Sequence, residues 1–172
     1  MRPISLPIVT SRLKLRPLTR DDLHPVFKIL SDRETVAGRS FAKRTVQESD
    51  AWLLKRQMDQ LEHGISMWAV DHKRIGLIGL CGFFIHGKEL EIGYVIKFDY
   101  QGQGFGAEAA SAALAAACDA GWPVFATIRP SNATSIRVAE KIGLARSDGE
   151  QMADLAMYRA SLPLTALNVT DR

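Results

Sequence analysis

The chain has 172 residues, the length of one domain rather than two. Hydrophobic residues make up 47% of the sequence and charged residues 24%, so a packed core is expected and general disorder is excluded. The 22 lysine and arginine residues exceed the 19 acidic residues by 3, and there is no basic run of the kind that follows a nucleic-acid backbone. We therefore expect a single domain over residues 1–172, without a direct nucleic-acid partner.

Cysteine content and hydropathy narrow the class of protein further. Two cysteines, Cys81 and Cys118, are too few for a disulfide framework, and no histidine stands at metal-ligand spacing from them. Cys81 lies in an apolar segment, which is typical of a buried small hydrophobe rather than a nucleophile. The longest uncharged apolar run, residues 75–85, has 11 residues, whereas a membrane-spanning helix needs about 20. We expect a cytoplasmic protein with no metal and no membrane partner.

The first part of the chain predicts a strand followed by two helices. Residues 6–18 contain an alternation of apolar and charged residues that suits a half-buried strand. The first helix is expected to begin near Asp22. Thr45 and Glu48 form a capping box that predicts the start of the second helix, and Gly64 is placed to end it. The apolar stripe of that second helix is expected to consist of Leu54, Met58 and Leu61.

The second part predicts a run of strands and then an alternation of helices and strands. Strands are expected at residues 67–70, 75–85 and 90–96, with His86 in the turn before the last of them. A glycine-rich loop follows these strands. After the loop we expect an alanine-rich helix at 107–120, a strand at 124–128, a helix opened by Asn132 and a strand at 153–159. This order predicts one mixed α/β sheet.

The most informative segment is the glycine-rich loop, which follows a strand and opens a helix. Its sequence runs Gln101-Gly102-Gln103-Gly104-Phe105-Gly106. The first backbone N–H groups of a helix have no partner within the helix, and the helix dipole adds a partial positive charge there. Glycines have no Cβ, so a phosphate can approach those N–H groups closely. The loop is therefore a candidate site for a phosphate-bearing cofactor.

Three interpretations of this loop compete. The first is a turn that only needs positive φ angles. The second is a dinucleotide site, because residues 104–109 satisfy G-x-G-x-x-A. Such a site needs an acidic residue about 20 positions further on, and none occurs between Ala120 and Ala139. A nucleoside-triphosphate P-loop is excluded, because no Gly-Lys-Ser or Gly-Lys-Thr occurs. The third interpretation is an acyl-coenzyme A site.

This third interpretation comes from a family resemblance. Gln101-x-x-Gly104-x-Gly106 resembles the Q/R-x-x-G-x-G/A pyrophosphate motif of the GNAT N-acetyltransferases. The segments at residues 11–18, 91–94 and 132–144 resemble the RimJ/RimL-type branch (ribosomal-protein-alanine N-acetyltransferase-like), which acetylates protein N-terminal amines. The resemblance extends from about residue 11 to about residue 159, the expected core of the domain. It implies a mixed, mostly antiparallel central sheet of about 6–7 strands flanked by about four helices.

The resemblance implies acetyl-CoA as co-substrate and indicates which residues bind it. The backbone N–H groups of residues 101–106 are expected to hold the pyrophosphate, and the pantetheine arm to lie along the strand at residues 94–96. Asn132 is expected to bond that arm and Ser135 to face the coenzyme, although helix capping explains both residues as well. The cofactor-binding residues so implied are Tyr94, Val95, Ile96, Gln101, Gly102, Gln103, Gly104, Phe105, Gly106, Asn132 and Ser135.

The implied reaction is direct attack of a neutral amine on the acetyl thioester. Glu91 is the nearest candidate base, although a solvent-facing or ion-paired glutamate explains it equally well. Many family members have a tyrosine that protonates the leaving thiolate, and at that position this chain has Ala139. Ser135, Tyr94, Tyr100 or a water is expected to take its place. The candidate catalytic residues are Glu91, Ser135 and the N–H group of Ile96, which is expected to bind the thioester carbonyl.

Two other functions fit part of the pattern. One is an NAD(P)-dependent oxidoreductase that uses the same glycines, and the other is a non-catalytic acyl-CoA-binding module. The sequence leaves open whether the acceptor is a peptide N-terminus, a polyamine, an antibiotic or an amino acid. A basic segment at residues 39–44 would favour an acidic or phosphate-bearing acceptor. The predicted partners are acetyl-CoA and an amine-bearing acceptor, bound by a monomer or a homodimer.

Overall fold

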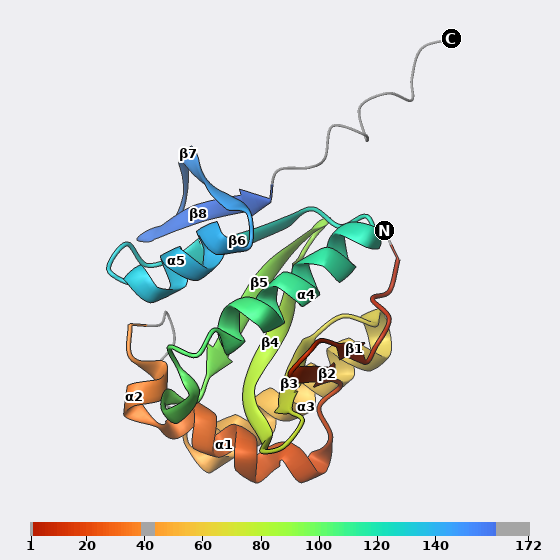
Figure 1. Ribbon diagram of the computed structural model, residues 1–172. Helices are drawn as coiled ribbons and strands as arrows, with labels where there is room; N and C mark the ends of the chain where they lie inside the picture. The colour runs from red at the N-terminus through yellow and green to blue at the C-terminus, as the bar shows by residue number, and fades with distance from the viewer. Residues whose placement is uncertain (1, 39–43, 161–172) are drawn as a thin grey trace.

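Eight extended segments pair into one mixed sheet in the computed structural model, which describes residues 2–38 and 44–160 (Figure 1). The strands lie in the order β1-β2-β3-β4-β5-β6-β8-β7. Every neighbouring pair is antiparallel except β5 and β6, which are parallel. The strands are β1 (Ile8–Val9), β2 (Leu13–Arg16), β3 (Met67–His72), β4 (Gly76–His86), β5 (Glu89–Ile96), β6 (Val124–Ile128), β7 (Leu144–Met152) and β8 (Leu155–Ala160).

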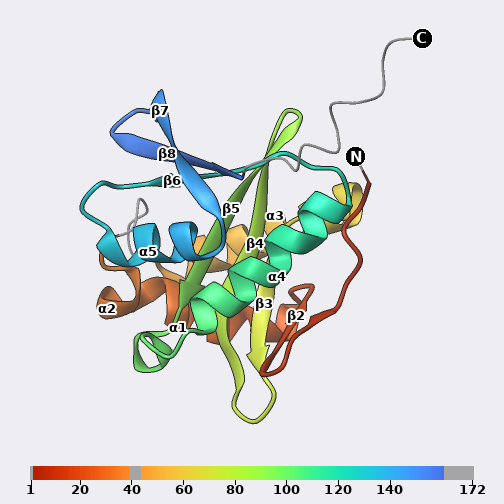
Figure 2. The ribbon, with the colours of Figure 1, turned by 45° about the horizontal axis from the view of Figure 1, so that its top comes forward.

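Helices cover both faces of this sheet. In Figure 2, α4 crosses the near face over β3, β4 and β5, whereas α1 and α3 lie behind the sheet. Each face has its own core, one that includes Leu90, Ile92 and Ala113 and one that includes Ile29 and Leu53. The α-helices are α1 (Leu23–Ser31), α2 (Arg33–Val36), α3 (Val46–His63), α4 (Phe105–Asp119) and α5 (Ala133–Lys141).

The predicted mixed, mostly antiparallel fold is confirmed, but the described residues hold more strands than the sequence predicted. The single strand expected at residues 6–18 is the hairpin of β1 and β2. β7 was missed because its sequence is mostly polar and lacks an alternating pattern. It is held in the sheet by pairing with β8. The short helix α2 was missed as well, and it begins at Asp32, whose carboxylate accepts a hydrogen bond from the N–H of Thr35 at 2.9 Å.

The predicted ends of α3 are confirmed, but its predicted apolar stripe is wrong. The Thr45 hydroxyl accepts a hydrogen bond from the N–H of Glu48 at 3.2 Å, and Gly64 ends the helix in the left-handed conformation with φ +68°. The three residues of the predicted stripe face outward. Their exposed fractions are 44% for Leu54, 60% for Met58 and 87% for Leu61.

The face of α3 that packs against the sheet is largely polar. Leu53 is fully buried there. Ser66 donates a hydrogen bond to the carbonyl of Arg56 at 2.7 Å, and the indole N–H of Trp68 donates to Gln60 at 2.8 Å. These hydrogen bonds satisfy polar groups at the helix–sheet contact. Hydrophobicity alone therefore predicted the wrong face.

Small side chains let α4 lie close to the sheet. Ala109, Ala110, Ala113 and Ala117 have no exposed surface and belong to the core on that side. This close contact fixes the start of α4 near the end of β5, with which α4 is in contact.

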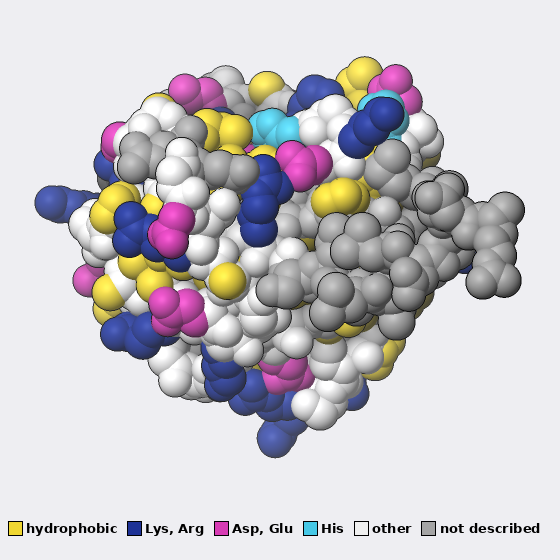
Figure 3. All heavy atoms as spheres, turned by 90° about the horizontal axis from the view of Figure 1, so that it is seen from above, with side chains coloured by type: hydrophobic (Ala, Val, Ile, Leu, Met, Phe, Trp, Pro, Cys, Tyr) yellow, Lys and Arg dark blue, Asp and Glu magenta, His cyan; other side chains and the backbone are white. Residues whose placement is uncertain are grey.

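The surface carries mixed charge. Over the face seen in Figure 3, basic and acidic side chains are interspersed with hydrophobic ones. Within residues 2–38 and 44–160, no helix is both long enough and apolar enough to cross a membrane.

A partly buried ion pair fixes the segment between β2 and α1. The Arg16 guanidinium bonds both carboxylate oxygens of Asp22, at 2.7 and 2.9 Å, and reaches Asp71 on β3 at 2.6 Å. Burial disfavours the charged form of Asp22, but hydrogen bonds from Arg16 and Thr19 outweigh it and hold the pKa of Asp22 below its usual value. The ionised pair therefore stabilises the fold near neutral pH.

Asp22→Asn should lower the free energy of unfolding at pH 7 by about 2 kcal/mol, because it replaces a charge-assisted bidentate interaction. The pKa of Asp22 is depressed in the folded state. Its contribution is therefore complete above the unfolded value of about 3.9 and is lost as the pH falls through the folded value. Urea unfolding of wild type and variant should thus show a difference that shrinks as the solution is acidified.

The matched control is Asp21→Asn, because Asp21 is the exposed neighbour of Asp22. It should change stability by no more than about 0.5 kcal/mol. A difference between wild type and Asp22→Asn that stayed constant on acidification would contradict the assigned role of Asp22.

Candidate functional site

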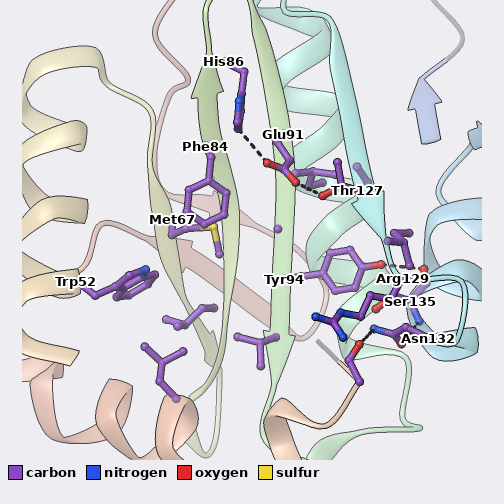
Figure 4. Close-up of a pocket in the computed structure, with 18 residues that line it drawn as sticks. Trp52, Met67, Phe84, His86, Glu91, Tyr94, Thr127, Arg129, Asn132 and Ser135 are labelled. Atoms are coloured by element: carbon purple, nitrogen blue, oxygen red, sulfur yellow. Dashed lines mark hydrogen bonds and ion pairs between the residues drawn. The ribbon is translucent and has the colours of Figure 1, made fainter. Parts of the chain in front are cut away.

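The two parallel strands in the sheet separate after two residue pairs. β5 and β6 are paired only at Leu90 with Val124 and at Glu91 with Phe125. Beyond these pairs, β5 continues to Ile96 without a paired strand on that edge among the described residues. A cavity of about 390 Å³ opens in and beside the gap (Figure 4). The edges of β5 and β6 that would hydrogen-bond to each other in a continuous sheet therefore border a cavity.

Strand alternation shows which N–H groups of β5 face the gap. The N–H of Leu90 donates to the carbonyl of Pro123 at 2.9 Å, toward β6, and the N–H of Lys97 donates to the carbonyl of Ile78 at 2.9 Å, toward β4. Every second residue of a strand directs its N–H to the same edge. The N–H groups of Tyr94 and Ile96 therefore point into the gap. Ile96, the expected donor to the thioester carbonyl, has its N–H on the edge that a ligand would meet.

The glycine-rich loop presents free N–H groups at the start of α4. Gly102 and Gly104 have φ +74° and +82°, so their conformation itself requires glycine. The first bond inside the helix runs from the N–H of Glu108 to the carbonyl of Gly104 at 3.0 Å. The N–H groups of the first helical residues, Phe105 and Gly106 among them, consequently have no helical partner. The structure thus contains both the turn and the anion-binding geometry that the sequence left as alternatives.

The two glutamines of the loop support its shape. The side-chain amide of Gln101 donates to the carbonyl of Ile96 at 2.8 Å, and that of Gln103 donates to the carbonyl of Asp99 at 3.2 Å. The N–H of Gln101 is itself occupied by the carbonyl of Phe98 at 3.0 Å. The N–H groups open to an anion therefore begin after Gln101.

Arg12, for which the sequence indicated no role in the site, holds the loop from the side of the N-terminal hairpin. Its guanidinium donates to the carbonyl of Gln103 at 3.1 Å, pairs with Glu108 at 2.6 Å and lies 4.3 Å from the centre of the Phe105 ring. Burial disfavours ionisation of Glu108, but hydrogen bonds from Thr10 and Arg12 outweigh it and lower the pKa of this carboxyl. A second hollow of about 400 Å³ lies beside this contact and includes Lys141 at the end of α5.

The side chains expected near the pantetheine arm meet where α5 borders the cavity between β5 and β6. Asn132 accepts a hydrogen bond from the N–H of Ser135 at 3.1 Å and donates to the carbonyl of Gly38 at 3.1 Å. The hydroxyl of Tyr94 donates to the carbonyl of Ser135 at 3.0 Å. Asn132 therefore caps α5 and also borders the cavity, as Figure 4 shows. The side chain of Val95 is buried on the opposite face of β5, where α1 and α3 pack.

Glu91 is held between two side chains inside the cavity. One of its carboxylate oxygens lies 2.9 Å from Nε2 of His86, and the other accepts a hydrogen bond from the hydroxyl of Thr127 (Figure 4). The Glu91 side chain is 19% exposed and that of His86 is 41% exposed. The carboxylate is thus fixed in orientation and still accessible from the cavity.

The prediction that His86 is a turn residue is wrong. His86 is the last residue of β4, and its ring packs edge-on against Phe125 at a centroid distance of 5.5 Å. Strand alternation places His86 and Glu91 on the same face of the hairpin, a signal that the sequence contained. Thr127 gave no such signal, because the register of β6 against β5 cannot be read from either strand. The basic residues expected to shape the acceptor cleft lie mostly at 39–43, outside the described residues.

Two other expectations concern chemistry elsewhere in the protein. Cys81 is completely buried, and burial raises the pKa of its thiol to about 12, as expected for a residue that only packs. Ala139, at the family's tyrosine position, has no exposed surface. Within residues 2–38 and 44–160 there is no group of three or more histidine, cysteine, aspartate or glutamate side chains that could hold a metal ion.

Sequence comparison identifies the family. A model of the family described as "Acetyltransferase (GNAT) domain" matches residues 12–145. The uncharacterized protein YkkB of Bacillus subtilis (strain 168) is 32% identical over 148 residues, which cover 80% of this chain and 84% of that relative. The chain belongs to the GNAT acetyltransferase family. It is therefore an acetyltransferase that uses acetyl-CoA, and the nicotinamide interpretation of the glycines is dropped.

Solved structures share the fold. The acetyltransferase from Agrobacterium tumefaciens str. C58 matches with a TM-score of 0.78 at 23% identity, over 91% of this chain and 95% of that one. RimL, a ribosomal L7/L12 alpha-N-protein acetyltransferase, in complex with coenzyme A matches with a TM-score of 0.74 at 16% identity, over 88% of this chain and 94% of that one. The neighbours thus include the RimL-type enzymes named from the sequence.

The two cysteines should differ sharply in reactivity. Cys118 is exposed and Cys81 is buried, so a thiol reagent should label Cys118 in the native protein and reach Cys81 only after unfolding. Mass spectrometry of the labelled peptides measures both. Labelling of Cys81 as fast as Cys118 in native protein would show that the interior thiol is accessible after all.

Proposed function

We propose that this protein transfers the acetyl group of acetyl-CoA to a primary amine, including the α-amine of a peptide or protein, by direct attack. The observation that carries the proposal is the gap between β5 and β6. The gap ends near the free N–H groups at the start of α4 and is bordered by a held carboxylate. RimL, a structural neighbour, acts by its name on an α-amine, which supports this acceptor class.

The coenzyme would bind along the length of the gap. The N–H groups of residues 102–106 would hold its pyrophosphate, and the pantetheine arm would lie against β5 at residues 94–96 in place of a neighbouring strand. Asn132 and Ser135 border the same side of the cavity and would bond the amide groups of that arm. The hollow beside Arg12 and Lys141 has room for the nucleotide end.

The N–H of Ile96 would stabilise the transition state. Acyl transfer places negative charge on the thioester oxygen, and one aligned N–H donor there lowers the barrier by about 3 kcal/mol. No side chain has to move for this, because the donor belongs to the strand that binds the arm.

Glu91 would receive the proton of the acceptor ammonium, directly or through a water. At pH 7, deprotonation costs about 4.6 kcal/mol for a lysine amine and about 1.4 kcal/mol for an α-amine, so an α-amine demands less of the base. The departing thiolate, with a pKa of about 8.5 in free cysteine, needs little help from an acid. Ser135, on the cavity wall, can supply a proton where Ala139 cannot.

The assembly and location of the enzyme remain predictions from the sequence. We propose one acetyltransferase domain over residues 1–172 with its core from about 11 to 159, acting in the cytoplasm as a monomer or homodimer.

Gly104→Asp should raise the KM for acetyl-CoA more than tenfold, because it puts a carboxylate where the pyrophosphate would bind and a side chain on a backbone with φ +82°. Steady-state kinetics with varied acetyl-CoA measure the change. Gly87→Asp is the matched control: it has φ +61°, lies in the turn between β4 and β5, and has open space for a side chain. An unchanged KM in Gly104→Asp would exclude the loop as the pyrophosphate site.

Glu91→Gln should lower kcat about 100-fold near neutral pH. Activity should recover in part as the pH rises toward the pKa of the acceptor amine, about 8 for an α-amine, because solvent then supplies the neutral form. Glu89→Gln, on the same face of β5 but paired with Arg159 at 2.6 Å, is the control. Unaltered turnover and pH profile in Glu91→Gln would remove this residue as the base.

A separate measurement tests the alternative of a non-catalytic acyl-CoA-binding module. Release of free coenzyme A thiol when the protein is given acetyl-CoA and an amine would exclude that alternative.

A further inference from the structure

The cavity between β5 and β6 has two different walls, which Figure 4 shows on either side of Glu91. On one side, Tyr94, Arg129, Asn132 and Ser135 border the gap between the strands. On the other side, α1, α3 and the face of the sheet against which they pack together form an almost wholly apolar surface. That surface consists of Leu30, Trp52, Met67, Leu80, Phe84 and Val95.

The apolar wall lies where the acceptor would approach. The coenzyme arm is proposed for the gap, so the acceptor must reach the acetyl group from the side on which Glu91 is exposed. Phe84 and Glu91 are directly opposite each other in the β4–β5 ladder and share that face. A molecule with its amine at Glu91 would therefore place its next atoms against Phe84 and the residues around it.

Charge in the cavity fits one ammonium group and not several. Among the described residues that line the cavity, Glu91 is the only carboxylate. Its two oxygens already contact His86 and Thr127. Each further ammonium group of a polyamine or aminoglycoside would lose water without gaining a second carboxylate, which is unfavourable.

The aromatic residues of the apolar wall already have a cation beside them. The Arg56 guanidinium lies 5.8 Å from the centre of the Trp52 ring and 5.0 Å from that of Phe84, and it pairs with Asp59 at 3.1 Å. Arg56 is 11% exposed, so its charge is held against these rings from within the protein. A second cation at the rings would meet a like charge, whereas a hydrocarbon group would not.

We infer that the acceptor is a primary amine carried by one bulky apolar group. Two sources share this chemistry: a peptide whose first residue has a large apolar side chain, and a free alkylamine or arylalkylamine. In either case the single ammonium lies at Glu91 and the apolar group contacts Trp52 and Phe84. This inference rests on the proposed acetyl transfer and specifies the acceptor for the same site.

The test compares acceptors at fixed acetyl-CoA. Peptides that differ only in a first residue of Leu, Phe, Met, Ser or Asp form one arm, phenethylamine forms the second, and spermidine and kanamycin form the third. We expect kcat/KM at least tenfold higher for the apolar peptides or phenethylamine than for the Ser and Asp peptides, spermidine and kanamycin. The ratio between the first two arms distinguishes a peptide from a free amine.

Trp52→Ala should lower kcat/KM for the apolar acceptors about tenfold and leave the KM for acetyl-CoA within twofold. Leu61→Ala is the control, because Leu61 is on the same helix and is 87% exposed. A thermal melt of both variants checks that they fold. The acceptor profile of the wild-type enzyme tests the inference even if Trp52→Ala does not fold.

Two kinds of failure can be told apart. Preference for spermidine, kanamycin or the Asp peptide, or indifference to the first residue, would overturn the inference while leaving acetyl transfer intact. Absence of acetylation of every amine, in protein that binds acetyl-CoA, would instead overturn the proposed function and the inference with it.

Discussion

The separation of β5 from β6 is the constraint on which the rest of the site depends. A sheet satisfies its backbone groups by pairing strands, and these two strands pair at only two positions before they diverge. In the proposed function, the amide groups of the coenzyme arm would bond the strand N–H groups that the gap leaves without a strand partner. The same divergence places β6, the start of α5 and the hairpin of β4 and β5 around one cavity.

Local features of this site could be predicted from the sequence, because short-range geometry determines them. The conformation of Gly102 and Gly104 and the capping pair of Thr45 and Glu48 depend on residues a few positions apart. The contact of Glu91 with Thr127 spans 36 residues and depends on the register of two parallel strands. No pattern within either strand specifies that register, so the contact could only be found in the structure.

The wall proposed to contact the acceptor was the part of the cavity that the sequence predicted least well, and α3 shows why. Its sequence contains an apolar stripe, yet the fold buries the face with Leu53 and leaves Leu61 outside. The buried face is chosen by contacts with β3, such as the hydrogen bond from Trp68 to Gln60. That choice turns Trp52 toward the cavity. The shape of the acceptor wall therefore depends on tertiary hydrogen bonds that hydrophobic periodicity does not reveal.

Among the described residues that line the cavity, the polar side chains gather around Glu91 and α5, and the opposite wall is almost wholly apolar. Arg12 and Glu108 neutralise each other while they hold the loop, so the anion-binding N–H groups need no flexible basic side chain beside them for their shape. Glu91 is likewise held in one orientation by a histidine and a threonine. A single carboxylate next to an apolar wall is the basis of the proposed preference for an acceptor with one amine. In the proposed function, the coenzyme is therefore bound mainly by backbone groups, whereas the acceptor is bound by side chains of the cavity.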